Sequence, residues 1–250
     1  MFNTTKETLI GAQIPTQTRT YKPVSHEQLI DLTLNGVEKA GFKINKETYT
    51  SAQEGQIANA RYSIQNVADN EMSLEIGWQN SYNKTLSLKF AIGAHIFICS
   101  NGMVRGDMGT FKKKHMSDVQ EFTPANIQEY IKRAGDHFTL LQRDRDAMKQ
   151  VEITKRTSAE LIGRMFIEED FIKSTQLMIL SREMETPTHD YNSPNSVWEF
   201  YNNVTFSMKS LHPSLWMENH IKLHDFIINE SGLLTSSSNM VETIECFEVM

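Results

Sequence analysis

The sequence predicts an α+β fold in which an antiparallel β-meander sheet, packed by helices, precedes a helical C-terminal half. Two observations carry this prediction. Between Phe42 and Val104 apolar and polar residues alternate, as in strands with one buried face and one wet face. After His115 the apolar residues recur at helical spacing instead.

The chain of 250 residues is long enough to bury one large core, and its 39% hydrophobic and 22% charged residues are typical of a folded protein. We expect residues 1–24 to form an extended N-terminal arm. Residues 25–232 are expected to form a single α+β domain, sheet-rich over 25–115 and helical over 116–232. Residues 233–250 are expected to be a flexible acidic tail.

Local signals mark the elements of the sheet-rich part. Ser25 and Gln28 have the capping-box spacing that begins a helix, expected over 25–40. Strands follow at 46–52, 56–66, 72–79 and 86–100, giving a sheet of four or five strands. Asn101-Gly102 predicts a tight turn after the last of them, because this pair tolerates positive φ.

The helical part has its own start signals. Thr123-Pro124 supplies a capping hydroxyl and a proline in the first turn of a helix expected over 124–149. Shorter helices are expected at 158–167 and 174–184. Ser196 and Glu199 form a second capping box that begins another helix, and a last helix is expected over 214–230.

Two short segments resemble a known family. The first is Trp78-Gln79-Asn80-Ser81-Tyr82-Asn83-Lys84-Thr85, leading through a long strand to Cys99-Ser100-Asn101. The second is Trp198-Glu199-Phe200-Tyr201-Asn202-Asn203-Val204-Thr205, with His212-Pro213-Ser214 downstream. Together they resemble the phage/plasmid-like family of the domain of unknown function 932 (DUF932) over roughly residues 21 to 230. In this sequence Asn83-Lys84-Thr85 stands where the family more often has Asp-x-Ser.

The resemblance implies an origin in a phage, a plasmid or a bacterial genome, and it implies no known activity. A cytoplasmic location, in a bacterium or a phage-infected host cell, is expected for three further reasons. The chain has two cysteines, Cys99 and Cys246, outside any paired motif. Its N-terminus lacks the pattern of a signal peptide. No apolar run approaches the ~20 residues that cross a bilayer.

The charge is unevenly distributed. The net charge is −6, yet the segment from Ile76 to His115 contains six cations and one acid, Asp107. Aromatic residues are interleaved with these cations. Single-strand binders combine cations that contact phosphates with aromatic faces for the bases. We therefore expect a nucleic-acid-binding set in this segment: Lys84, Lys89, Arg105, Lys112, Lys113 and Lys114. The alternative is a core hairpin whose lysines are simply solvated.

Other polar groups have structural explanations as well as functional ones. A cluster of Asn80, Ser81, Asn101 and Asn202 would hold a ligand if the sheet met the C-terminal helices; otherwise these residues close turns. His220 and His224 have zinc-ligand spacing, but Ile221 stands where the general-base glutamate of the zinc-protease motif would be. Cys99 ends an apolar strand, and this position predicts a buried side chain that packs like a small hydrophobic residue.

We therefore expect no catalytic residue, no metal and no cofactor. The function expected is that of a non-enzymatic accessory protein that binds nucleic acid, in particular single-stranded DNA, in replication or recombination. The alternative is a protein-interaction module acting on a host or phage protein, favoured by 13 adaptable methionines. Hidden enzymatic activity is the third hypothesis. No membrane partner is expected, and the oligomeric state is left open.

Overall fold

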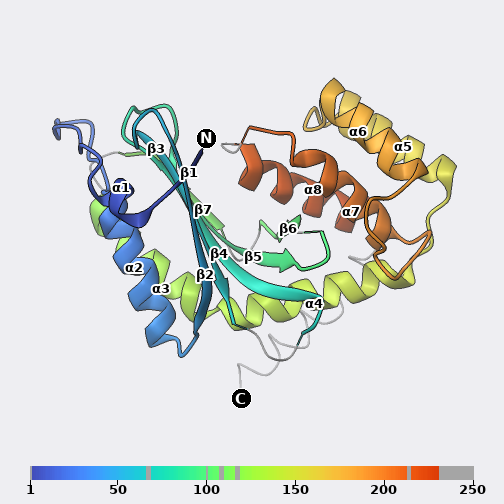
Figure 1. Ribbon diagram of the computed structural model, residues 1–250, viewed down its shortest axis with the longest axis horizontal. Coiled ribbons are helices and arrows are strands. Elements are labelled where there is room, and N and C mark those ends of the chain that lie inside the picture. Colours follow the sequence, from blue (N-terminus) through green and yellow to red (C-terminus); the bar gives the residue numbers. More distant parts are fainter. Residues whose placement is uncertain are drawn as a thin grey trace, which may run out of the picture.

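The computed structural model describes residues 2–65, 69–99, 101–106, 110–115, 119–212 and 215–230, with the backbone alone for 119–123 (Figure 1). These residues form one antiparallel sheet of seven strands and a set of helices around it. The α+β fold is as predicted: the meander occupies the N-terminal half, and helices make up the C-terminal half.

The strands are β1 (Phe2–Thr4), β2 (Ile44–Ala52), β3 (Ile57–Ile64), β4 (Met72–Ser81), β5 (Leu88–Ile96), β6 (Asn101–Val104) and β7 (Thr110–Lys113). They lie in the order β1-β2-β3-β4-β5-β6, and β7 pairs with the first half of β5 in line with β6. The sheet thus has more strands than the four or five predicted. Beyond the four predicted ranges, the sheet contains β1 at the N-terminus, β6 after β5, and β7 within the basic segment.

Residues 2–10 of the N-terminal segment pack against the sheet and the hydrophobic core. β1 pairs with β2, and α1 (Lys6–Ile10) follows it directly. The α1 side chain Leu9 is fully buried in the main hydrophobic core. Residues 2–24, predicted as an extended arm, therefore include a strand and a short helix before their extended stretches.

One face of the sheet is covered by α2 (His26–Lys39), α3 (Val119–Lys132) and α4 (Ala134–Gln150). Ser25 caps α2 as predicted, its Oγ accepting from the Gln28 N–H at 2.9 Å. The side chains of β4 that alternate onto this face include Ile76 and Trp78, both buried. The single helix predicted over 124–149 is divided at Arg133, so that α3 packs against α2 while α4 continues across β5 to α7.

The C-terminal helices are α5 (Lys155–Ile167), α6 (Ser174–Glu185), α7 (Val197–Met208) and α8 (Trp216–Glu230). Helices α7 and α8 lie on the side of the sheet opposite α2 and α3 (Figure 1). The helix start predicted at Ser196 is confirmed, because the Ser196 Oγ accepts from the Glu199 N–H at 3.2 Å. The Glu199 carboxylate accepts from the N–H of Asn195, one residue before the N-cap, and not from that of Ser196 as a capping box requires.

The sheet face opposite α2 to α4, which the alternation predicts to be exposed to solvent, is exposed only in part. Strand β4 is buried along its whole length. Small residues on β4, β5 and β6 let the start of α8 approach closely. A Cβ on Gly102 would lie 2.6 Å from Cζ2 of Trp216, so this position admits no side chain without displacing the indole. The part of the same face formed by β1 to β3 carries polar residues and is not closed in this way.

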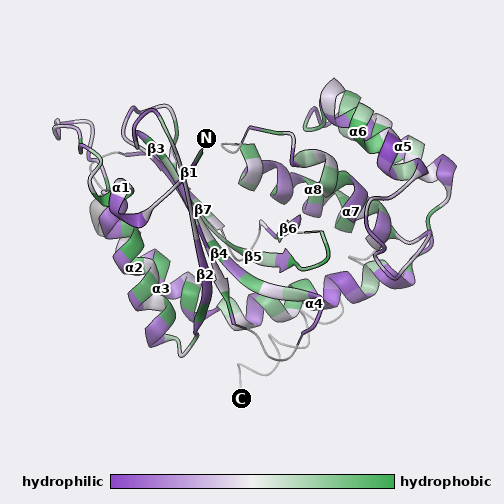
Figure 2. Cartoon of the chain, viewed as in Figure 1, coloured by the Kyte–Doolittle hydropathy of each residue, from purple (hydrophilic) through white to green (hydrophobic). Residues whose placement is uncertain are grey.

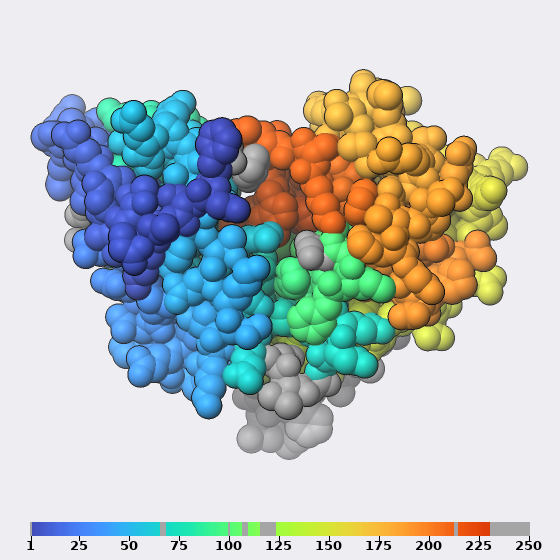
Figure 3. All heavy atoms as spheres, viewed as in Figure 1, coloured from blue at the N-terminus to red at the C-terminus, as the bar shows by residue number. Residues whose placement is uncertain are grey.

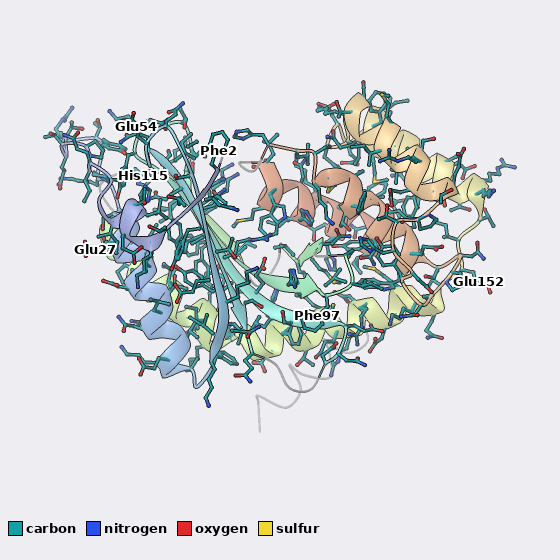
Figure 4. The ribbon with its side chains drawn as sticks, in the orientation of Figure 1. Phe2, Glu27, Glu54, Phe97, His115 and Glu152 are labelled. Carbon is teal, nitrogen blue, oxygen red and sulfur yellow. The ribbon has the colours of Figure 1, made fainter. Side chains whose placement is uncertain are left out.

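The hairpin between β5 and β6 differs from the prediction. Its turn is formed by Phe97–Cys99, and the exposed Phe97 is labelled in Figure 4. Asn101 and Gly102, predicted as the turn, are instead the first residues of β6. The reason is tertiary: the side chain of Asn101 reaches α7, and Gly102 leaves room for Trp216.

Candidate functional site

A row of polar side chains crosses the face of the sheet that α2 to α4 leave open. Its members stand directly opposite one another on successive strands, so they lie about 4.8 Å apart and the row is roughly 24 Å long. From β1 to β7 the row consists of Asn3, Thr50, Asn59, Gln79, Lys89 and Lys112. We call these six residues the polar row.

One end of the polar row opens into a cleft between the sheet and the C-terminal helices. The cleft has a volume of about 270 Å³, and four members of the row line it together with Arg61, Lys209 and Trp216. Figure 3 shows the surface hollowed between the N-terminal strands, in blue, and the helices in orange-red. The guanidinium of Arg61 lies 5.2 Å from the centre of the Trp216 ring, a cation–π contact between the two layers.

The other end of the polar row reaches the basic edge, which we define as Lys22, Lys84, Lys112, Lys113 and Lys114. Lys113 stands opposite Leu88 on β5, which places β7 beside the β4–β5 turn that carries Lys84. The Lys22 N–H donates to the carbonyl of His115 (labelled in Figure 4), and Lys84 Nζ lies 4.6 Å over the Tyr21 ring. Four of the six predicted cations thus meet at one edge.

The remaining two predicted cations are paired with acids from distant helices. Lys89 Nζ lies 3.0 Å from Glu218 Oε2 on α8, and the exposed Lys112 is 3.8 Å from the same oxygen. This hydrogen bond from Lys89 lowers the pKa of Glu218. Arg105 points toward α4, where its Nη1 donates to Asp144 Oδ2 at 3.0 Å. The structure therefore separates Arg105 from the other predicted cations.

The predicted polar cluster divides into two parts. Asn101 and Asn202 meet as that hypothesis required, because Asn101 Nδ2 donates to the Asn202 carbonyl at 3.1 Å and to Thr205 Oγ1 at 2.7 Å. Asn80 lies on the opposite face, where its Nδ2 donates to the Val24 carbonyl. Ser81 exchanges hydrogen bonds with Leu86 and closes the β4–β5 turn.

The two α8 histidines make separate contacts. His220 Nδ1 donates to the Gly102 carbonyl at 2.8 Å, and complete burial lowers its pKa to about 4. His224 Nε2 lies 3.0 Å from Asp144 Oδ2. Within the described residues no three His, Cys, Asp or Glu side chains are placed to hold a metal ion.

Cys99 is buried, and its Sγ lies 3.6 Å from Asn202 Oδ1. Burial raises the pKa of the Cys99 thiol. A thiol that stays protonated is a poor nucleophile. The environment of Cys99 therefore gives no support to nucleophilic chemistry.

The comparison with protein families gives an assignment for most of the chain. The profile described as the domain of unknown function DUF932 matches residues 15–214. The chain belongs to the DUF932 family. This confirms the resemblance carried by the segments around Trp78 and Trp198, and the match covers most of the sheet and of the C-terminal helices.

Neither the curated proteins nor the solved structures gave a match to this DUF932 chain. A search of the described helices found none with the length and apolar character needed to cross a bilayer. The family carries no assigned activity in its description, so any function has to be argued from the geometry of the site.

Sequence reasoning missed the residues that line the cleft, Arg61, Lys209 and Trp216. Arg61 is a polar position of an alternating strand, and Lys209 follows the last residue of α7. Such positions are most often solvated, so nothing local marked them. Only the approach of α8 to the sheet brings these side chains together.

Proposed function

We propose that this DUF932 protein binds single-stranded nucleic acid, in particular single-stranded DNA, across the open face of its sheet. The observation that carries the proposal is the polar row, which joins the basic edge to the cleft lined by Arg61, Lys209 and Trp216. Cations at both ends suit phosphates, and a half-exposed indole suits a base. Strand binding, as in replication or recombination, is the activity this chemistry fits.

The bound strand contacts the two ends of the row and not its middle. The start of α8 covers Gln79 and Lys89, which are 3% and 8% exposed. The exposed lysines Lys84, Lys112 and Lys114 contact phosphates at the basic edge. Glu218 lies 3.8 Å from the exposed Lys112, so binding at this lysine exchanges a carboxylate for a phosphate while the buried Lys89 keeps its ion pair with Glu218.

The test is fluorescence anisotropy with a labelled oligothymidylate of about 20 nucleotides, longer than a site of ~4–16 nucleotides. Binding should be detectable at ~50 mM salt and should weaken steeply toward ~200 mM, because counterions are released from the phosphates. Replacing Lys112 and Lys114 by Gln should lower the affinity and reduce the slope of log K against log salt by about 1.4, or ~0.7 for each lost contact.

A matched control removes the same charge elsewhere. Lys39 and Lys132 are exposed in the last turns of α2 and α3, so the double change to Gln alters the net charge equally without touching the sheet. Equal losses in the two double variants, or no binding by the wild type at ~50 mM salt, would refute the proposal.

The second candidate, a protein-interaction module, has one observation in its favour. A groove of about 550 Å³ lies between α5 and α6, with apolar walls that include Phe166, Leu177 and Met184. Figure 2 shows hydrophobic and hydrophilic residues side by side on these helices, and nearby Met178 is 78% exposed. A partner that stays bound after nuclease treatment and is lost on Phe166→Glu would favour this candidate.

A further inference from the structure

A second cavity lies behind Trp216, between the sheet and the end of α7. Its volume is about 220 Å³, and its walls include Arg61, Asn101, Thr205, Lys209, Trp216 and His220. The cavity and the cleft described above share Arg61, Lys209 and Trp216. Both charged residues that line the cavity are cations, and no carboxylate lines it.

The guanidinium of Arg61 packs against an aromatic ring but keeps N–H groups that can donate to a ligand. Its guanidinium stacks on the Trp216 ring, and the side chain is 36% exposed. It forms an ion pair with Glu75, whose Oε1 lies 3.7 Å from Arg61 Nη1, but at this distance the carboxylate accepts no hydrogen bond from the guanidinium. A guanidinium carries five N–H donors in a planar fork that matches phosphate oxygens. In the described part of the chain these donors have no closer anion.

Lys209 approaches the same space from the helical layer. Its Nζ donates to the carbonyl of Cys99 and lies 4.6 Å over the Phe206 ring. Among the described residues no carboxylate forms an ion pair with Lys209. Burial lowers the pKa of Lys209, which is the effect expected of a cation that lacks an anionic partner.

The polar walls complete the site. Asn101 is 2% exposed, and its Nδ2 donates to the Asn202 carbonyl and to Thr205 Oγ1. Its Oδ1 accepts no hydrogen bond from the residues that the structure describes. Because His220 donates through Nδ1 to the Gly102 carbonyl, its Nε2 is an acceptor in the neutral ring. The cavity therefore offers cationic donors for an anion and acceptors for N–H groups, beside an aromatic ring.

We propose that this cavity binds a nucleoside monophosphate unit, with its phosphate between Arg61 and Lys209 and its base against Trp216. The ligand is either a free nucleotide or the phosphorylated end of a strand. As a terminal-nucleotide site it deepens the proposed strand binding. As a site for a free nucleotide it does not depend on that function.

The test titrates the wild-type protein with thymidine 5′-monophosphate, thymidine and inorganic phosphate, by calorimetry and by tryptophan fluorescence. Trp78 and Trp198 are buried, so a fluorescence change reports mainly on Trp216. Thymidine 5′-monophosphate should bind about tenfold or more tightly than thymidine, because charge-assisted hydrogen bonds to the phosphate are lost with the nucleoside. Phosphate alone should compete with the nucleotide.

Two variants remove one cation each, from different layers. Arg61→Gln and Lys209→Gln should each weaken nucleotide binding about tenfold or more, whereas Lys132→Gln on α3 should not change it. Trp216→Phe should abolish most of the fluorescence change while calorimetry still detects the nucleotide. Thermal melting followed by circular dichroism establishes that each variant is folded.

The outcomes separate this inference from the proposed function. Nucleotide binding that survives both Arg61→Gln and Lys209→Gln, or equal affinities for nucleotide and nucleoside, overturns the inference. So does an absence of nucleotide binding at millimolar concentration, even where oligothymidylate binds. If the nucleotide binds and oligothymidylate does not, the inference holds and strand binding is wrong. A 5′-phosphorylated oligothymidylate that outcompetes its unphosphorylated form identifies the strand end as the ligand.

Discussion

His26 makes the fold sensitive to acid, because its neighbours accept only the neutral ring. The imidazole is fully buried, and it stacks on Tyr82 with ring centres 4.0 Å apart. Its Nε2 donates to the Gly55 carbonyl at 2.8 Å, and its Nδ1 accepts from Asn80 Nδ2 at 3.1 Å. A proton on Nδ1 would face an amide that also donates, and no carboxylate among the described residues pairs with His26 to stabilise the positive charge.

The size of the effect follows from linkage. Burial lowers the pKa of His26 from 6.5 to about 4, against the hydrogen bond to Gly55, which raises it, and with a small further lowering by His115. Between about pH 4 and pH 6.5 His26 is protonated in the unfolded chain and neutral in the folded protein. The contribution of His26 to the free energy of unfolding is therefore fully present above about pH 6.5 and is lost as the pH falls toward about 4. From pH 7 to pH 4.5 the loss is about 2–3 kcal/mol, a large part of the ~5–15 kcal/mol of a typical domain.

The assay compares urea unfolding of wild type and His26→Gln at neutral and acidic pH. The variant should be less stable at pH 7, because it loses the stacking on Tyr82. Its stability should nevertheless fall by about 2–3 kcal/mol less than that of the wild type on going to pH 4.5. His189→Gln, at a half-exposed position between α6 and α7, is the control. Parallel pH profiles for wild type and His26→Gln would refute the reasoning.

Three further changes probe the contacts between layers. Gly102→Ala should cost about 1–3 kcal/mol in urea unfolding and shift the Trp216 emission, because the new Cβ would lie 2.6 Å from the indole. Asn101→Ala removes two hydrogen bonds to α7 and should cost about 1–3 kcal/mol with an unchanged m-value. Arg145→Met removes the donor that lies 2.7 Å from the buried Asp69 carboxylate, and should lower stability by roughly 1–3 kcal/mol at pH 7.

The parts of the fold that depend on local chemistry could be predicted from the sequence. Strand alternation marked β2 to β5 within a few residues, and the caps at Ser25 and Ser196 fixed the starts of α2 and α7. These signals lie within a few residues of the structure they specify, since a capping hydroxyl bonds a backbone N–H two or three positions away. The family signature lay partly in such stretches, at β4 and α7, and partly at Cys99 and Asn101, where the hairpin differs from the prediction.

The candidate site could be predicted only in part, because its charges are set by distant partners. Lys89 appeared free in the sequence, yet its partner Glu218 lies 129 positions further along the chain. Arg105 likewise pairs with Asp144 on a helix whose packing no local pattern specifies. Lys84, Lys112 and Lys114 are exposed and lie at one edge of the sheet, whereas Lys89 and Arg105 are paired with acids. The role of these cations in binding nucleic acid stays a prediction.

The site depends on how one face of the sheet is divided. Over β5 and β6 this face carries small residues, Ala91, Gly93 and Gly102, and α8 closes onto them. Over β1 to β3 it carries Thr50, Asn59 and other polar side chains, which would be costly to bury without partners. Helix α8 therefore packs on β5 and β6 but stays away from β1 to β3. The size and polarity of the residues on this face thus account for the cleft that Arg61 and Lys209 line. The walls of this cleft are the sheet on one side and, on the other, the end of α7 and the start of α8.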